Sequence, residues 1–363
     1  MRVLVDVHQV GGRATGNETW AAQVARAIQR DPSLGPADHV VLAVAHPDGS
    51  ALATRASVAR VGTSSASRLA RQIPRIARRE RIDAVLVQYT VPVSRVPSVV
   101  AIHDLSFTDP ASSAWIRPAE RARMNATIRW SARRAGRILA LSEHTASDLC
   151  AKWGVARERI VVAPPAVDDE LLARLRARPP GVGGPDGATV LAVGNVLPRK
   201  NLVVAARAVA VLNARGTAAR LRVVGSVPRD RGDLLAALTA AAGGRVDVTG
   251  YATVDQLVSA YHQADVLVFP SLYEGYGLPV IEAMAAGVPV VASDATALPE
   301  AVDGAGVLVS PRDPEAWADA IERVLTDQHH AETLRRLGRE RVERLSWRDT
   351  GRQALDALRE VVA

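Results

Sequence analysis

The sequence holds a single cysteine, Cys150, among 363 residues, so it cannot form a disulfide within the chain. It also has no apolar run of the ~18 residues that a membrane-spanning helix needs. The amino-terminal stretch MRVLVDVHQV alternates apolar and polar residues as a strand does. It lacks the charged start and the long apolar segment of a secretory signal. Together these absences predict a cytoplasmic protein.

Negative charge is scarce in the first half of the chain. Residues 1–170 hold 23 Lys and Arg against 16 Asp and Glu, whereas residues 171–363 hold 22 of each, so the formal charge of +7 belongs to the first half. The basic residues are densest at 71–83 and 117–137, where we expect helices with arginine-rich faces. Such faces are either solvated or suited to an acidic substrate or to peripheral contact with the inner face of an anionic membrane. Too few aromatic residues accompany these arginines to favour nucleic acid as a partner.

Short apolar runs form two series that alternate with helical stretches. The first series is 3–7, 40–45, 84–89, 98–104, 137–142 and 159–165, and the second is 189–195, 220–226, 245–250, 265–271, 289–294 and 306–310. Most runs are continuously apolar, which is typical of parallel strands buried on both faces. The pattern predicts an α/β protein of two Rossmann-like domains, joined by a linker at the Pro- and Gly-rich stretch 175–188.

Two glutamates stand in a very apolar part of the sequence, SLYEGYGLPVIEAMAAGVPVV. Glu274 follows an expected strand, and Gly275 and Gly277 let the backbone turn sharply there. Pro279 suits the start of a helix, whose amino end is an anion-binding site. Glu282 falls in the first turn of that helix, where a carboxylate either stabilises the helix dipole or accepts hydrogen bonds from hydroxyl groups of a ligand.

This stretch resembles a known donor-site signature. The spacing E-x7-E, written EGYGLPVIE and followed by AMAAGVPVVAS and ALPE, is similar to that of retaining glycosyltransferases of the GT-B type, above all glycosyltransferase family 4 (group 1) and its mannosyltransferases. VGNVLPRKNL resembles the phosphate loop of that family, and VTGYATVDQLVSAYHQADVLVFPSLYEG resembles the segment that leads into the motif. AIHDLSF, SEHTASDL and RIVVAPPAVD resemble parts of its amino-terminal domain. The resemblance covers almost the full chain.

The resemblance implies a GT-B fold, in which two Rossmann-like domains with parallel sheets face each other across a cleft. It implies an acceptor-binding domain at 1–175, a donor-binding domain at 186–346, and a last helix at 347–363 that packs back on the first domain. The implied activity is retaining transfer of a mannose- or glucose-type hexose from a GDP- or UDP-sugar to a hydroxyl of a glycan, lipid-linked or small-molecule acceptor. We expect no metal and no cofactor beyond the nucleotide sugar, because the sequence has no His/Cys cluster and no clear Asp-x-Asp motif.

The resemblance also assigns roles in a donor site. Glu274 is expected to contact hydroxyl groups of the transferred sugar, and Glu282 those of the ribose. In the loop between them, Gly275, Tyr276, Gly277 and Leu278 are expected to bind the donor, and the amides at Gly277 and Leu278 are expected to meet the diphosphate. Contacts with the base are expected around Thr249 and Tyr251.

Lys200 is one of two lysines among 45 basic residues, the other being Lys152. It follows an expected strand and begins a helix, next to Arg199. Negative charge builds on the leaving diphosphate as a glycosidic bond breaks, and fixed cations stabilise that charge without a metal ion. The alternative is that Lys200 is an ordinary exposed surface charge. Many family members carry arginine where this sequence has Asn195, so Arg199 is the candidate for the second cation.

Residues of the first domain are expected to complete the site. His103 and Asp104 end the expected strand 98–104, where the family has a histidine near the sugar and the acceptor. With Glu274 they are the candidate catalytic residues. Gly12 and Gly16 belong to VGGRATGNETW, a glycine loop before a helix, whose amides are expected near the donor phosphates.

Three other functions stay open at this point. A glycoside hydrolase uses two carboxylates as acid and nucleophile, and Glu274 and Glu282 offer such a pair, although this leaves Lys200 unexplained. A nucleotide-sugar 2-epimerase would share the expected fold and react without an acceptor. A basic adaptor at an anionic membrane would bind lipid whether or not Lys200 and Glu274 were intact.

Overall fold

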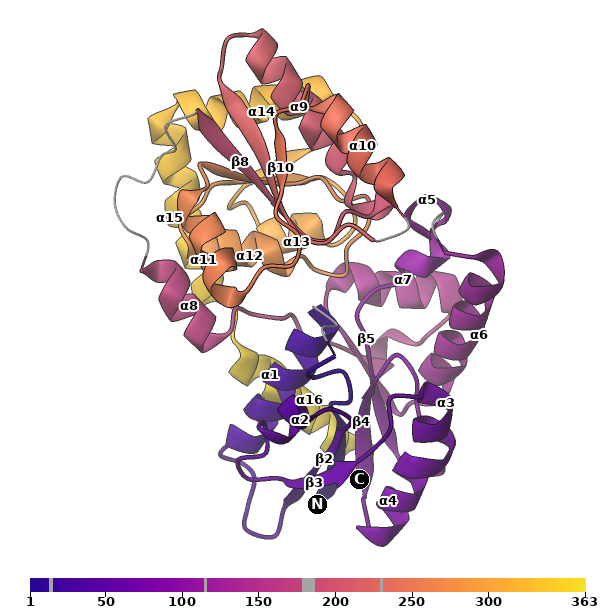
Figure 1. The fold of residues 1–363 in the computed structure, drawn as a ribbon. Helices are drawn as coiled ribbons and strands as arrows, with labels where there is room; N and C mark the ends of the chain where they lie inside the picture. The colour runs from indigo at the N-terminus through magenta and orange to yellow at the C-terminus, as the bar shows by residue number, and fades with distance from the viewer. Residues whose placement is uncertain (13–15, 114–115, 178–186, 229–230) are drawn as a thin grey trace. The chain divides into compact units, whose positions relative to one another are not determined.

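The computed structural model describes residues 1–12, 16–113, 116–177, 187–228 and 231–363. Contacts divide the chain into two compact units (Figure 1), of which unit 1 is Met1–Thr108, Arg117–Pro165 and Ser346–Ala363, and unit 2 is Asp109–Ile116 and Ala166–Leu345. Most of the linker expected at 175–188 lies outside the described residues. Its first two residues belong to helix α8 (Asp169–Arg176) of unit 2.

Unit 1 is a seven-stranded parallel sheet with helices on both faces. Its strands are β1 (Arg2–Asp6), β2 (His39–Val44), β3 (Ser57–Arg60), β4 (Ala84–Gln88), β5 (Ser98–Ile102), β6 (Arg137–Ala140) and β7 (Ile160–Val162), in the order β3-β2-β1-β4-β5-β6-β7. Its helical segments are α1 (Gly16–Arg30), α2 (Pro47–Ser50), α3 (Ser65–Ser67), the π-helical turn η1 (Arg68–Gln72), α4 (Ile73–Arg79), η2 (Ser106–Thr108), α6 (Pro118–Arg134), α7 (Glu143–Trp153), η3 (Arg157–Arg159) and α16 (Trp347–Glu360). In Figure 1, α1 and α16 lie on one side of this sheet and α4 and α6 on the other.

The apolar runs of the first series form six of these seven strands. Strand β4 is buried at all five positions, as a central strand covered on both faces must be. Strand β3 was not expected from the sequence. Its four residues, SVAR, form an edge strand in which Ala59 alone is buried. An edge strand this short has no apolar run to signal it.

Unit 2 repeats the architecture with six parallel strands. They are β8 (Ala188–Val193), β9 (Ala219–Val224), β10 (Val246–Val248), β11 (Val266–Phe269), β12 (Val290–Ser293) and β13 (Val307–Val309), in the order β10-β9-β8-β11-β12-β13. Besides α8, its helical segments are α5 (Pro110–Ser113), η4 (Pro198–Lys200), α9 (Leu202–Ala214), α10 (Gly232–Ala241), α11 (Val254–Gln263), α12 (Leu278–Ala285), α13 (Leu298–Val302), α14 (Pro314–Thr326) and α15 (Gln328–Glu343). Residues of β8, β9, β11, α9 and α14 form its main apolar core. The second series of apolar runs gives all six strands, so the expected α/β class with two parallel sheets is confirmed.

The two basic stretches of unit 1 are helical over most of their length. Residues 71–83 fall largely in η1 and α4, and residues 117–137 fall largely in α6. Helix α6 ends in Arg133 and Arg134, which suit the negative end of the helix dipole. Among the described residues, no helix combines the length and the apolar character needed to cross a bilayer.

The last helix, α16, is part of unit 1 and packs against α1. The side chain of Ser346 caps its amino end by accepting hydrogen bonds from the amides of Arg348 and Asp349. At the crossing with α1, a Cβ on Gly351 would lie 2.4 Å from the Cβ of Ala27. The two helices therefore approach more closely than any other side chain at position 351 would allow.

Replacement of Gly351 by alanine tests this packing. We expect Gly351→Ala to lower the free energy of unfolding by about 1–3 kcal/mol, because the added methyl group forces one helix to shift. Gly232→Ala is the matched control, since Gly232 also lies in a helix but an added Cβ there meets no atom within 4 Å. Urea unfolding followed by circular dichroism measures both variants. Equal unfolding midpoints for the two would contradict the packing account.

Candidate functional site

The strand order of unit 2 brings two loops together. Strand β8 lies between β9 and β11 in the sheet. The chain runs from β8 to β9 on one side and from β11 to β12 on the other, so the connections that follow β8 and β11 diverge. The β8–α9 loop (194–201) and the β11–α12 loop (270–277) therefore start side by side at the carboxyl edge of the sheet. Open α/β sheets bind their ligands in the crevice at such a switch point.

Two cations and one carboxylate meet in this crevice. Nζ of Lys200 lies 2.7 Å, and a guanidinium nitrogen of Arg199 lies 3.0 Å, from the same oxygen, Oε1 of Glu274. Arg199 also donates to the carbonyl of Tyr273 at 3.2 Å. The Glu274 residue is 9% exposed. The two cations make this a place where an anionic ligand is attracted.

The charges around Glu274 determine its ionisation. Burial by itself raises the pKa of this carboxyl, but the charges of Lys200 and Arg199 outweigh burial and lower the pKa from 4.5 to about 2. Glu274 is therefore an anion throughout the physiological pH range. In that state it accepts hydrogen bonds and has no proton to give as a general acid.

Local structure aims Lys200 at the crevice. Lys200 ends the turn η4, and its ammonium group lies 4.6 Å from the ring centroid of Phe269, as in a cation–π contact. Asn201 follows with a left-handed backbone (φ 51°), and its side-chain amide donates to the carbonyls of Pro270 (3.1 Å) and Pro311 (2.6 Å). The first bond ties the two loops together, and the second ties them to the loop that follows β13. A side chain at Gly194 would press against Lys200 at 3.2 Å, so glycine there leaves room for the lysine.

The loop between β12 and α13 holds the backbone of the β11–α12 loop. The amide of Glu274 donates to Oγ1 of Thr296 at 3.0 Å. Thr296 has a left-handed backbone, with φ 53°, which is a true outlier for a β-branched residue. Strain of this kind persists where the surrounding structure fixes it, and it clusters at ligand sites. Thr296 was not expected from the sequence, because a threonine in a turn gives no signal of its partner.

Helix α12 presents its amino end to the same edge of the sheet. Gly277 precedes the helix with φ 118°, a conformation that residues with a side chain rarely adopt, and a Cβ there would lie 2.9 Å from Leu298. Leu278 begins the helix. Pro279 has no N–H, and the amide of Val280 donates to the carbonyl of Gly277 at 2.9 Å, so α12 offers the amide of Leu278 and the positive end of its dipole. The loop with Gly275 and Gly277 therefore delivers an anion-binding helix end next to the cations of the β8–α9 loop.

Glu282 lies on α12 and has a different environment from Glu274. It accepts a hydrogen bond from the hydroxyl of Tyr261 at 2.7 Å. Burial raises the pKa of Glu282, and the hydrogen bond from Tyr261 opposes that rise. The two glutamates of the motif are therefore shifted in opposite directions. Tyr261 was missed in the sequence, although a tyrosine on the buried face of an amphipathic helix signals a hydroxyl that needs a partner.

Tyr276 lies in the loop between the two glutamates and points inward. It is buried, and its hydroxyl accepts a hydrogen bond from Arg341 of α15 at 2.9 Å. Burial raises the pKa of Tyr276 to about 12. Arg341 also donates to the carbonyls of Glu300 and Ala301 in α13. Arg341 thus links the loop to two helices, and its role was not visible in the sequence.

Three expected donor-site residues of unit 2 make other contacts. Asn195 accepts the amide of Ser226 at 3.0 Å, so it joins the loops that follow β8 and β9. Thr249 donates both its amide and its hydroxyl to the carbonyl of Val223. Tyr251 is 64% exposed. Arg199, Lys200 and Glu274 are therefore the expected residues that the structure brings into direct contact.

His103 lies in unit 1 at the carboxyl end of β5. It is enclosed between the rings of Trp20 and Tyr89, whose centroids lie 5.1 Å and 5.2 Å from its own. Burial lowers the pKa of His103 to about 3, so the imidazole is neutral at physiological pH. Its Nε2 has no hydrogen-bond partner among the described residues. Tyr89 has a left-handed backbone (φ 57°), which is unusual for a bulky residue.

The other expected residues of unit 1 have local partners. Asp104 accepts the amide of Ser106 at 2.8 Å and so begins the turn η2. The amide of Gly12 donates to the carbonyl of Gln9, and Gly16 is the first residue of α1. The segment RAT that separates them lies outside the described residues.

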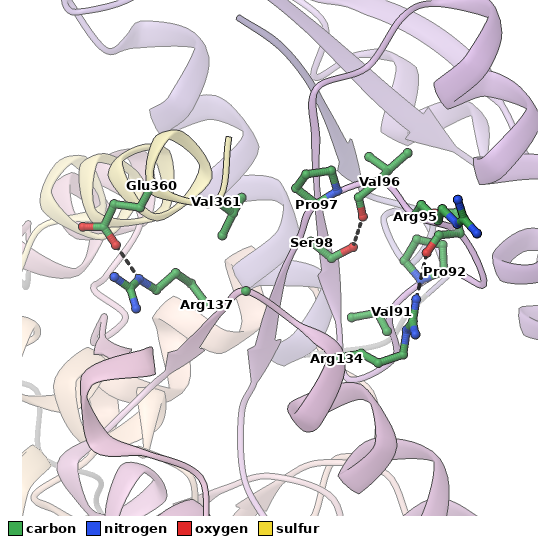
Figure 2. A pocket seen from close by; sticks show the side chains of 12 residues that line it. Val91, Pro92, Arg95, Val96, Pro97, Ser98, Arg134, Arg137, Glu360 and Val361 are labelled. Carbon is green, nitrogen blue, oxygen red and sulfur yellow. Dashed lines mark hydrogen bonds and ion pairs between the residues drawn. The ribbon is translucent and has the colours of Figure 1, made fainter. Parts of the chain in front are cut away.

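A pocket of about 420 Å³ opens at the opposite edge of the unit 1 sheet (Figure 2). It lies at the amino ends of β5 and β6, where Arg137 pairs with Glu360 of α16 and Arg134 donates to the carbonyl of Ser94. These guanidinium groups are engaged by partners in the chain. Ligands of parallel sheets bind at the carboxyl edge instead. We therefore interpret this pocket as the place where the end of α16 joins the sheet.

In the part of the chain that the structure describes, no three His, Cys, Asp or Glu side chains converge as a metal site would require.

Family models match both halves of the chain. Residues 16–171 match a model described as Glycosyltransferase Family 4, and residues 187–327 match one described as Glycosyl transferases group 1. A D-inositol 3-phosphate glycosyltransferase of Saccharomonospora viridis is 36% identical over 249 residues, which cover 63% of this chain and 56% of that protein. The chain thus matches little more than half the length of this relative. An O-antigen chain mannosyltransferase B of Escherichia coli is 30% identical over 271 residues, covering 72% of this chain and 69% of the relative.

Solved structures share the fold along nearly the whole chain. A sucrose-phosphate synthase of Thermosynechococcus elongatus superimposes with a TM-score of 0.76 at 22% identity and covers 99% of both chains. HepE of Anabaena, solved in complex with UDP and glucose, superimposes with a TM-score of 0.70 at 17% identity, again over 99% of both chains.

Replacement of Glu274 by glutamine tests the ionised cluster. We expect Glu274→Gln to lower the free energy of unfolding at pH 7 by about 3 kcal/mol, because a pKa lowered from 4.5 to about 2 corresponds to ~1.4 kcal/mol per unit. Because the pKa of Glu274 is lower in the folded than in the unfolded state, its ionisation stabilises the folded state above pH 4.5. This stabilisation is lost as the pH falls from 4.5 toward 2.

Urea unfolding between pH 7 and pH 3 measures the difference between wild type and Glu274→Gln. The difference should stay constant down to about pH 5 and shrink below it. A difference that persists undiminished at pH 3 would contradict the assigned ionisation.

Proposed function

Because the chain belongs to glycosyltransferase family 4, we propose that it transfers a hexose from a nucleotide-diphosphate sugar to a hydroxyl group of an acceptor. The observation that carries this proposal is the position of Arg199, Lys200 and the amino end of α12 around one crevice. A diphosphate is a ligand group that suits two cations and the positive amino end of a helix. The transfer retains the anomeric configuration and uses no metal ion.

The proposed mechanism rests on electrostatic stabilisation of the leaving group. When the glycosidic bond breaks, the bonding electrons pass to the phosphate oxygen, and Lys200, Arg199 and the positive amino end of α12 stabilise that charge. Glu274 is already ionised and accepts hydrogen bonds from hydroxyl groups of the sugar. The acceptor oxygen bonds to the anomeric carbon on the face from which the diphosphate leaves, and the leaving phosphate takes the proton of that hydroxyl, so the configuration is retained. Glu282 accepts hydrogen bonds from the ribose.

Similar proteins guide the choice of donor. The structure of HepE holds UDP and glucose, which supports a UDP-sugar. The mannosyltransferase among the relatives supports mannose as the sugar, for which GDP is the alternative carrier. The proposal therefore names UDP- and GDP-hexoses, with mannose or glucose as the sugar. Base contacts from Thr249 to Tyr251 belong to this proposal.

The acceptor is proposed from unit 1 and from the relatives. Unit 1 carries His103 and Asp104 at its carboxyl edge, and we assign these residues to the sugar and the acceptor. The names of two relatives give acceptors that are cyclic polyols or aminocyclitols: D-inositol 3-phosphate, and 2-deoxystreptamine for a glucosyltransferase of Streptomyces kanamyceticus, which is 33% identical over 259 residues. The O-antigen relative supports a glycan. These three acceptors form the panel for an assay.

A glycoside hydrolase is the second candidate, because Glu274 and Glu282 have pKa values shifted in opposite directions, as an acid and nucleophile pair requires. In that case the crevice would act on a glycoside without any nucleotide. The cations on Glu274 favour the transferase, since a hydrolase has no diphosphate for them to bind. Release of a nucleoside diphosphate from the substrate separates the two candidates.

We further propose a cytoplasmic location with peripheral contact to an anionic membrane. Helix α6 exposes Arg123, Trp130, Arg133 and Arg134. The guanidinium of Arg134 lies 5.4 Å from the ring centroid of Trp130. Arginine attracts anionic headgroups, and tryptophan suits the interface between headgroups and acyl chains.

The donor-site assignment predicts the effect of two substitutions. We expect Lys200→Ala and Glu274→Ala each to reduce release of nucleoside diphosphate by at least ~10²-fold, as loss of transition-state contacts does. Lys152→Ala is the matched control: it removes the other lysine, which is exposed on α7 and paired with Asp148, and is expected to keep the wild-type rate. The assay uses UDP- and GDP-hexoses with the acceptor panel. Wild-type rates in both site variants would refute the assignment.

The membrane contact is tested by charge reversal. We expect the double variant Arg123→Glu/Arg133→Glu to lose most of its sedimentation with vesicles that contain anionic lipid, because each arginine near the surface contributes about 1 kcal/mol to binding. Arg336→Glu/Arg344→Glu on unit 2 changes the net charge equally and should sediment as wild type does. Equal losses for both pairs would mean that net charge, and not α6, determines binding.

A further inference from the structure

Tyr261 of α11 is a buried tyrosine with a charged partner. Its side chain has no exposed surface, so its hydroxyl must find a hydrogen-bond acceptor inside the protein. Two acceptors lie within reach, namely Oε2 of Glu282 at 2.7 Å and the carbonyl of Pro279 at 3.4 Å. A hydroxyl has one proton, and the shorter bond to a carboxylate is the stronger of the two. Tyr261 therefore donates to Glu282.

The two oxygens of Glu282 differ in their surroundings. Oε2 accepts the proton of Tyr261 on the inner side. Oε1 has no hydrogen-bond partner among the described residues. It is not among the fully buried side-chain atoms that lack a partner, so it keeps some exposed surface. Since the residue is half-buried, Oε1 is the part of the carboxylate that solvent or a ligand reaches. One oxygen is thus fixed, and the other is accessible.

The scaffold that carries Tyr261 is rigid. Thr253 and Gln256 form a capping box at the start of α11, in which each side chain accepts the backbone amide of the other residue. His262, the next residue after Tyr261, lies with its ring nitrogen 3.1 Å from the carbonyl of Leu175 in α8. The hydroxyl of Tyr261 therefore has a fixed position from which it orients Glu282.

We propose that Tyr261 is a positioning residue, which holds one oxygen of Glu282 so that the other accepts hydrogen bonds from the vicinal hydroxyl groups of the donor ribose. This inference rests on the proposed function and adds to it a residue and a specificity. A carboxylate held in this way favours a ribonucleotide, because a 2′-deoxyribose has one hydroxyl fewer to donate. An unconstrained carboxylate would discriminate less, since it can turn to meet a single hydroxyl.

The hydrogen bond also determines the pH range of donor binding. An ionised Glu282 accepts hydrogen bonds at both oxygens and binds hydroxyl groups more strongly, whereas a protonated one has an O–H donor and less acceptor capacity. Burial raises the pKa of Glu282, and the hydrogen bond from the Tyr261 hydroxyl lowers it. Removal of the hydroxyl must therefore raise the pKa of Glu282 further. Donor affinity should then fall at a higher pH than in wild type.

The test is a calorimetric titration of UDP-glucose and GDP-mannose, and of the 2′-deoxy form of whichever binds, from pH 5 to pH 8. Nucleotide sugars suit the test because their diester phosphates do not titrate in the range of a carboxyl group. We expect Tyr261→Phe to raise the dissociation constant about tenfold at pH 7, as loss of a hydrogen bond to a charged group does. The acid limb of binding, meaning the pH range in which affinity falls on acidification, should move to higher pH. The preference for ribose over deoxyribose should diminish.

Two further variants make the result decisive. Trp317→Phe removes the indole hydrogen bond to the carbonyl of Ser310 (2.8 Å) from another buried aromatic residue of unit 2, and it should leave the acid limb where it is. Glu282→Gln should lose both the acid limb and the ribose preference.

If Tyr261→Phe binds like wild type, or weakens binding equally at every pH and for both sugars, Tyr261 has a structural role and the inference is wrong. If Glu282→Gln binds like wild type, the ribose assignment in the proposed function is itself wrong.

Discussion

The interaction on which the rest of the site depends is the one between Glu274 and its two cations. Lys200 and Arg199 share a single carboxylate oxygen, at a point where the strand order β9-β8-β11 makes two loops start together. Burial alone would raise the pKa of this carboxyl, and the neighbouring cations reverse that effect. The two cations therefore keep Glu274 ionised, and the carboxylate in turn holds both cations at one point.

A second layer of contacts fixes the irregular backbone around this cluster. Residues 270–277 form neither strand nor helix, so their polar groups need partners from outside the loop. Thr296 takes the amide of Glu274, Arg341 holds the hydroxyl of Tyr276, and Tyr261 holds the carboxylate of Glu282. These three residues come from three different segments. The loop is thus held in place before a ligand arrives, which reduces the ordering cost of binding.

The sequence predicts the strands of both sheets well, because buried parallel strands are continuous apolar runs. It does not predict β3, which is short and exposed at an edge. It identifies Lys200, Arg199 and Glu274 as candidates, yet not their direct contact, because that depends on the order of strands in the sheet. Nor does it predict the roles of Tyr261, Thr296 and Arg341, because the partner of a buried hydroxyl or guanidinium is determined by packing between segments distant in sequence.

The central claim is that the cations on Glu274 are a diphosphate site. The most direct test is calorimetric binding of free UDP and GDP to wild type, Glu274→Gln and Lys200→Met. Glu274 competes with the phosphates for both cations, and a free nucleoside diphosphate has no sugar for Glu274 to contact. The account therefore predicts that Glu274→Gln binds one of the two diphosphates several-fold more tightly than wild type, and that Lys200→Met binds it more weakly. Unchanged or weaker binding by Glu274→Gln would contradict the account.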